Sequence, residues 1–138
     1  QMVQAARSGK QNIAEGAAAG NTSKETEIKL TNVAKASLQE LLVDYEDFLR
    51  VRGLKQWQPD DARLAQTKRA CAAHNDSEYY RKAMPERSAE TIANIAITLI
   101  HQTDWLLNKL IEKLEIQFVE NGGVKEQMTK ARKEYRGY

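Results

Sequence analysis

The chain has 138 residues, of which 41% are hydrophobic and 29% are charged, a balance typical of a single globular domain. Its 21 Lys and Arg against 19 Asp and Glu leave a net charge of only +2, which excludes a surface that is basic throughout. No apolar run approaches the roughly 18 residues of a membrane-spanning helix, and the single cysteine, Cys71, excludes an internal disulfide. These features predict a cytoplasmic domain that has no membrane segment.

Residues 1–19 are predicted to form a first helix with one face of mostly small side chains. At about 100° per residue, that face consists of Met2, Ala5, Ala6, Gly9, Ile13 and Gly16. Such a face lets another backbone approach closely, although a glycine inside a helix costs roughly 0.5–1 kcal/mol relative to alanine. Arg7 and Lys10 lie on roughly the opposite side, and they are candidate nucleic-acid-binding residues.

A second helix is predicted over residues 24–52. Thr22 and Glu25 have the spacing of a capping box at its start, and Gly53 stands where a glycine commonly ends a helix. Its apolar stripe, with spacings near three and four, consists of Ile28, Ala34, Leu38, Leu41, Tyr45, Phe48 and Leu49. Burial of one such large side chain is worth roughly 1.5–3 kcal/mol, so we expect this stripe to supply much of the core.

After a connector, the helical pattern returns over residues 61–83, with a pause at His74-Asn75, and again over residues 88–121. Ser88 is the expected cap of this last and longest helix. Its predicted core stripe consists of Ile92, Ile95, Leu99, Leu106, Leu110, Leu114 and Phe118. No stretch alternates in the manner of a β-strand.

The expected fold class is therefore all-α. Residues 1–121 are predicted to form an up-and-down four-helix bundle with an additional middle helix, followed by a short C-terminal helix over residues 124–138. That last segment carries five basic and two acidic residues. Its cations are candidate nucleic-acid-binding residues: Lys125, Arg132, Lys133 and Arg136. Its apolar side supplies candidate partner-binding residues: Val124, Met128 and Tyr135.

Few residues point to catalysis. Cys71 and His74 stand three apart and can share one side of a helix, but a zinc site needs two further ligands, and there is no second such pair. His101 and Asp104 also stand three apart, a spacing that we assign to a solvent-side or interhelix hydrogen bond. We expect no catalytic residue, no cofactor and no bound metal. A metal-dependent enzyme that uses Cys71 and His74 is kept as an alternative.

A second basic region lies between residues 62 and 87, where Tyr79 and Tyr80 stand among cations. These cations are Arg63, Lys68, Arg69, Arg81, Lys82 and Arg87. Cations interleaved with stackable rings are what proteins use to bind single-stranded nucleic acids. The alternative interpretation is structural: the cations keep the helices soluble, and the tyrosines pack against the bundle.

Two stretches carry a family resemblance. Residues 4–16 contain an Ala-Ala-x-Ser step followed by Asn-Ile-Ala-Glu-Gly, and residues 36–41 read Ala-Ser-Leu-Gln-Glu-Leu. Together they resemble a bacterial family of four-helix-bundle proteins. This family includes proteins encoded by intervening sequences in large-subunit ribosomal RNA genes and the accessory variability proteins of diversity-generating retroelements. Residues 54–87 and 124–138 exceed the basic pattern and resemble the subgroup with a C-terminal extension. Relatives have a helix before the signature, so we expect a further N-terminal segment.

The resemblance implies a bundle without catalytic activity that assembles into a ring, commonly a homopentamer. It also implies, for the retroelement relatives, binding of RNA and a reverse transcriptase through a positively charged surface. We therefore predict a homo-oligomeric accessory protein that binds nucleic acid, RNA in the first place, or a reverse transcriptase, or both. The alternative is a protein-only adaptor that docks a partner through the C-terminal helix.

Overall fold

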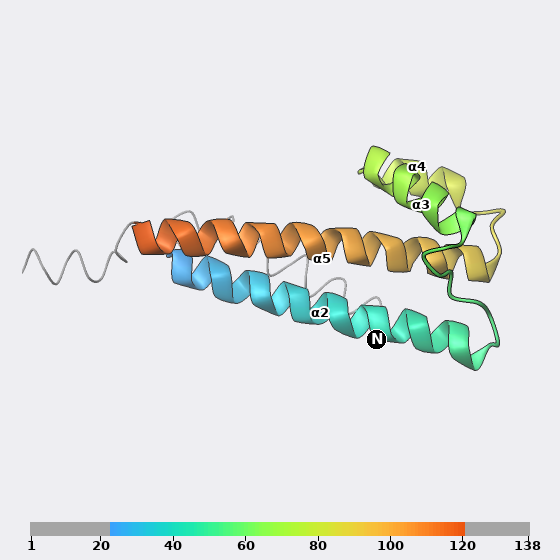
Figure 1. Cartoon of the computed structure of the whole chain (residues 1–138), viewed down its shortest axis with the longest axis horizontal. Coiled ribbons are helices and arrows are strands. Elements are labelled where there is room, and N and C mark those ends of the chain that lie inside the picture. The colour runs from blue at the N-terminus through green and yellow to red at the C-terminus, as the bar shows by residue number, and fades with distance from the viewer. Residues whose placement is uncertain (1–22, 121–138) are drawn as a thin grey trace, which may run out of the picture.

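The computed structural model describes residues 23–120, which form four helices and no strand. The two long helices are α2 (Lys24–Val51) and α5 (Ala89–Glu120), and the two short ones are α3 (Ala62–Ala73) and α4 (Ser77–Ala83). Figure 1 shows α2 and α5 side by side and antiparallel, with α3 beside the first half of α5 and α4 following α3 at the same end of the molecule. The all-α fold class is thus confirmed for this part of the chain. None of its helices is long and apolar enough to cross a membrane.

Helix α2 begins at residue 24 as predicted, but its capping residue differs by one position. Ser23 is the N-cap, and its hydroxyl accepts a hydrogen bond from the Thr26 backbone N–H at 3.2 Å. The capping box predicted from Thr22 and Glu25 is therefore wrong. A neighbouring hydroxyl residue satisfies the same unpaired backbone donors, and sequence spacing alone does not choose between the two.

The end of α2 is formed by Gly53, as predicted. This residue has φ of +66°, a conformation that costs glycine nothing because it has no Cβ atom. The Leu54 N–H donates to the Leu49 carbonyl at 2.8 Å and the Gly53 N–H donates to the Arg50 carbonyl at 3.2 Å. These two bonds form a Schellman motif, and they turn the chain away from α2 into the connector.

Carboxylate and hydroxyl caps begin the other helices. Asp61 accepts from the Arg63 N–H at 2.9 Å, and Asp76 accepts from the Tyr79 N–H at 2.7 Å. Ser88 accepts from the Thr91 N–H at 3.2 Å at the start of α5. The predicted pause at residues 74–75 is confirmed, since it separates α3 from α4.

The core lies between α2 and α5. On α2 the predicted stripe is confirmed: Ala34, Leu41 and Leu49 are buried, while Leu38, Tyr45 and Phe48 pack against the cluster. Two interhelix hydrogen bonds border it, from Lys35 Nζ to Asn108 Oδ1 at 2.6 Å and from Gln39 Nε2 to Asp104 Oδ1 at 3.1 Å. Asp104 thus makes the interhelix contact that we expected of it.

On α5 the predicted core stripe is largely wrong. Leu106 is 60% exposed, whereas its neighbour Leu107 is 6% exposed. Leu110 and Phe118 are also exposed, and of the predicted stripe only Leu114 is fully buried. The large aliphatic side chains buried on α5 are Ile97, Ile100, Leu107 and Leu114. The reason is that α5 carries two apolar stripes, which we call seams, about 100° apart around the helix. The first is the buried one, and the second is the predicted one that contains Leu106 and Leu110. The helical period alone does not tell which of them faces α2.

The middle helices do not pack as a third member of the α2–α5 pair. Within the described range, α3 packs against α5 and makes no comparable contact with α2. The predicted helices over 1–19 and 124–138 lie outside the described residues.

Candidate nucleic-acid interface

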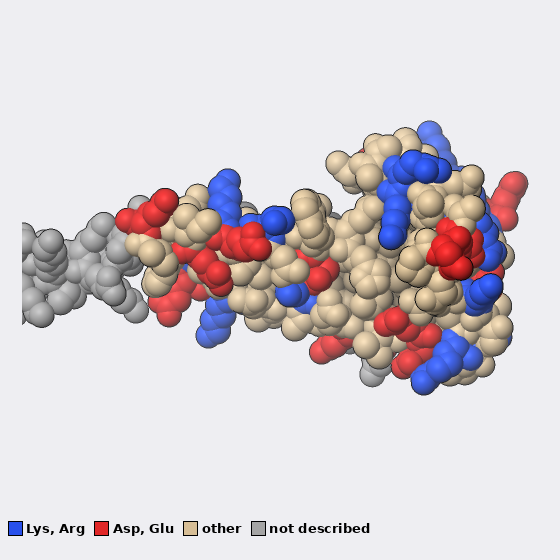
Figure 2. Space-filling model, viewed as in Figure 1, with Lys and Arg blue, Asp and Glu red and all other residues tan. Residues whose placement is uncertain are grey.

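Residues 62–87, which we call the α3–α4 head, carry six Lys and Arg against three Asp and Glu. Figure 2 shows Lys and Arg side chains over this end of the molecule, with Asp and Glu side chains both at this end and along the rest of the molecule. The head itself carries an excess of three positive charges, which attract an anionic partner to it.

Half of these cations already have carboxylate partners. Arg63 contacts Asp61 at 2.8 Å and Glu90 at 3.6 Å, while Arg81 and Lys82 both contact Glu78, at 3.5 and 3.9 Å. The hydrogen bond from Arg63 lowers the pKa of Asp61 to about 2 and Asp61 in turn raises the pKa of Arg63. This pair anchors the start of α3 instead of offering charge to a ligand.

The other three cations are free within residues 23–120: Lys68, Arg69 and Arg87 are exposed and contact no carboxylate there. Arg87 makes one weak bond from Nε to the Ala83 carbonyl at 3.3 Å. Exposed cations without a partner are the ones that can neutralise phosphates, since no internal ion pair has to be broken first.

The tyrosines of the head serve packing rather than open stacking. The Tyr79 ring stacks on His74 with centroids 3.6 Å apart and planes 2° from parallel, and Tyr80 meets it edge-on at 5.1 Å. The Tyr80 hydroxyl donates to the His74 carbonyl at 2.8 Å. Both rings are half-buried. They hold α4 against the end of α3, which is the structural interpretation of the basic and aromatic pattern.

Cys71 and His74 do not form a metal site with the residues around them. Within residues 23–120, no three His, Cys, Asp or Glu side chains come together as metal ligands. Burial raises the pKa of the Cys71 thiol, and the neighbouring Tyr80 hydroxyl offsets only part of that rise. Burial also raises the pKa of Tyr80, to about 12. Both groups are thus neutral near pH 7 and belong to the packing between α3 and α4.

A groove of about 400 Å³ opens between α3, α5 and the connector that follows α2. Asn94, which is only 2% exposed, organises its closed end. The Asn94 Oδ1 accepts from the Trp57 backbone N–H at 2.8 Å, and the Asn94 Nδ2 donates to the carbonyls of Lys55 and Glu90 at 2.9 and 2.8 Å. These three bonds fix the connector on α5 and hold the Trp57 ring in the core.

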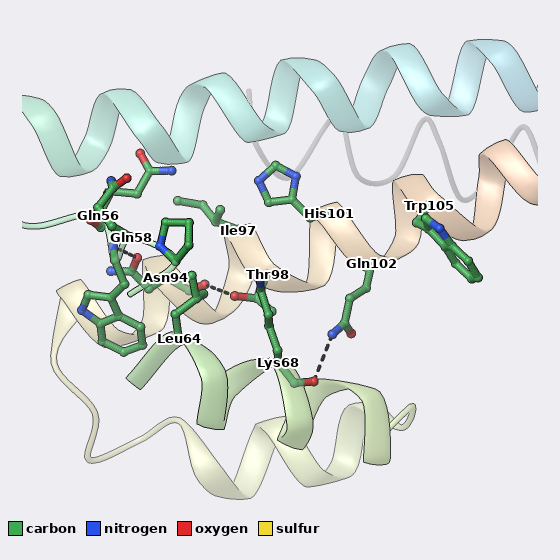
Figure 3. A pocket seen from close by; sticks show the side chains of 12 residues that line it. Gln56, Gln58, Leu64, Lys68, Asn94, Ile97, Thr98, His101, Gln102 and Trp105 are labelled. Carbon is green, nitrogen blue, oxygen red and sulfur yellow. Dashed lines mark hydrogen bonds between the residues drawn. The ribbon is translucent and has the colours of Figure 1, made fainter. Parts of the chain in front are cut away.

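The rim of this groove is polar and carries one cation. Figure 3 shows Lys68 reaching it from α3, Gln56 and Gln58 at one end, and Trp105 at the other end. Among the residues that the structure describes, no acidic side chain lines it. Sequence reasoning missed the groove because its walls come from segments far apart in the chain. The only local signals were Trp57 in a connector and Trp105 next to the predicted core stripe.

All the binding residues proposed for the two ends of the chain lie outside the described residues. The candidate nucleic-acid-binding residues among them are Arg7, Lys10, Lys125, Arg132, Lys133 and Arg136, and the candidate partner-binding residues are Val124, Met128 and Tyr135. Of the basic patches predicted from the sequence, the structure thus describes the one between residues 62 and 87.

Comparisons of the chain with protein-family models, with curated proteins and with solved structures found no match.

Proposed function

We propose that this chain is a cytoplasmic, non-catalytic helical accessory protein that assembles with copies of itself and binds nucleic acid through basic surfaces, RNA in the first place. In this proposal α2 and α5 are two members of an up-and-down four-helix bundle, and a reverse transcriptase is the protein partner to test first. The observation that carries the proposal is the α3–α4 head, whose Lys68, Arg69 and Arg87 are exposed and contact no carboxylate within the described residues.

Self-assembly is supported by the second apolar seam of α5. Leu106 and Leu110 are exposed on one face of the helix, where they lie about 40° apart at 100° per residue. Exposed apolar side chains that line up along a helix are typical of an interaction surface. A closed ring, such as a pentamer, would also repeat the three free cations once per subunit. Several weak patches that engage one strand then bind it far more tightly than one patch does.

Charge reversal on the head tests the nucleic-acid function. We expect the double variant Arg69→Glu/Arg87→Glu to lose most of its affinity for a labelled single-stranded RNA at low salt. The logarithm of the native association constant should fall with the logarithm of the salt concentration by roughly 0.7 for each phosphate neutralised. Fluorescence anisotropy over a salt series measures both quantities.

The matched control is Lys29→Glu/Lys113→Glu. These two lysines lie on α2 and α5, are exposed, and contact no carboxylate in the described range. This variant has the same net charge as the head variant. Equal loss of affinity in the two variants would mean that only total charge matters, and it would contradict the assignment of the nucleic-acid-binding site to the head. Binding that does not change with salt would rule out electrostatic recognition altogether.

A protein-only adaptor is the second candidate, and the last turns of α5 favour it. Ile116, Phe118 and Val119 are all exposed there, immediately before the predicted helix that carries Met128. In this case Met128→Lys abolishes the partner complex and leaves RNA affinity unchanged. Pull-down with a reverse transcriptase and RNA anisotropy on the same variant separate the two functions.

A further inference from the structure

The groove between α3, α5 and the connector has the dimensions of a ligand site. Its volume of about 400 Å³ lies within the range of pockets that hold small molecules or single nucleotides, roughly 300–1,000 Å³. It is too small for a docked helix, whose diameter with side chains is about 10 Å. Its occupant is therefore a compact group.

The closed end of the groove is rigid. The Asn94 side chain uses its oxygen on Trp57 and its two N–H donors on Lys55 and Glu90. The Thr98 hydroxyl donates to the Asn94 carbonyl at 2.9 Å. These polar groups are already paired inside the protein, so a ligand meets a preformed wall instead of one that must be ordered on binding.

The open rim, by contrast, keeps groups that can bind a ligand. The Lys68 ammonium contacts no carboxylate within residues 23–120, and no acidic side chain lines the groove. The Trp105 ring at its mouth is 60% exposed, and the Lys109 ammonium lies 5.5 Å from the ring centroid. At the other end (Figure 3), the side-chain amides of Gln56 and Gln58 already donate to the Glu46 carboxylate and to the Gln56 carbonyl, both at 3.3 Å, so they close that end.

We propose that this groove takes one unstacked base of a single-stranded RNA, with the Trp105 ring as its stacking surface and the Lys68 ammonium on the adjoining phosphate. The inference rests on the nucleic-acid function proposed above and adds a preference for single strands. Every base offers an aromatic face to an exposed indole. A duplex keeps its bases stacked and cannot supply one.

The test compares Trp105→Ala with Ile116→Ala in binding to a labelled oligoadenylate and to a duplex of the same length. Ile116 is 57% exposed on the same helix and does not line the groove, so it controls for the loss of a large exposed side chain. We expect Trp105→Ala to weaken binding of the single strand about tenfold, as the loss of one base stack does, and to leave duplex binding unchanged. Trp105→Phe should restore most of the affinity, and Ile116→Ala should change nothing.

If Trp105→Ala binds the single strand with native affinity, the groove is not the base site. The proposed function is still supported in that case, provided that the head variant Arg69→Glu/Arg87→Glu has lost affinity for RNA. Equal weakening of single-strand and duplex binding overturns the groove as the base site as well, because no base stack would then be involved. If the native protein binds neither probe, the proposed function fails, and this inference fails with it.

Discussion

At the scale of single residues, Asn94 joins the connector to α5 through the hydrogen bonds of its side-chain amide. It is 2% exposed and pairs with backbone groups of Trp57, Lys55 and Glu90. The connector has no regular structure of its own, so the Trp57 N–H and the Lys55 carbonyl depend on this side chain for their hydrogen bonds. An amide is suited to the task, because it donates two hydrogen bonds and accepts as well.

We therefore predict that Asn94→Ala lowers the free energy of unfolding by about 3 kcal/mol. A buried donor or acceptor left unpaired costs roughly 1–3 kcal/mol, and this change leaves the Trp57 N–H and the Lys55 carbonyl without their partner. Urea unfolding followed by circular dichroism and by Trp fluorescence measures the change. If the free energy of unfolding of the variant equals the native value within experimental error, water replaces Asn94 and the connector is not held as described.

Asp61 makes the stability of the fold depend on pH, with lower stability in acid. Its pKa is about 2 in the folded protein against 3.8 in the unfolded chain. A carboxyl with a depressed folded pKa stabilises the fold above its unfolded pKa, and that contribution is lost as the pH falls from about 4 to about 2. Asp61→Asn keeps a capping oxygen but removes the charge opposite Arg63. We expect the difference in melting temperature between the native chain and this variant to be largest at neutral pH and to vanish in acid. A difference that is constant with pH would contradict this account.

At the scale of the elements, local chemistry explains what the sequence could predict. Helix ends depend on neighbouring residues, so Gly53 and Ser88 were assigned correctly. The cap at Thr22 was wrong because Ser23 is chemically equivalent. The α5 seam was wrong for a different reason: two stripes have the same period, and only the position of α2 decides which one is buried. The groove was missed entirely, since it joins distant parts of the chain.

The contact between α2 and α5 sets the stability of this pair of helices. Leu49, in the last turn of α2, is 1% exposed, whereas Val51, two residues further on, is 80% exposed. We predict that Leu49→Ala costs about 3 kcal/mol in the free energy of unfolding, because it removes buried surface and leaves a cavity. Val51→Ala should cost less than about 0.5 kcal/mol, as surface changes do. Equal costs for the two variants, measured by urea unfolding, would contradict the assignment of the core.

At the scale of the whole molecule, one part of the described chain carries three free cations close together and another carries exposed leucines. Lys68, Arg69 and Arg87 belong to the α3–α4 head, while Leu106 and Leu110 belong to α5. Within residues 23–120, one copy therefore presents a weak basic patch and an exposed apolar seam at the same time. Assembly through the seam would cover the leucines and repeat the basic patch, so the nucleic-acid function that we propose depends on how many copies join.

The mass of the native protein in solution tests this claim most directly. Sedimentation equilibrium at micromolar concentrations should give a single mass several times that of one chain. The double variant Leu106→Lys/Leu110→Lys should give a smaller mass with unchanged helix content. One folded copy throughout the concentration range would contradict the account, because the seam would then have no partner and the basic patch would not be repeated.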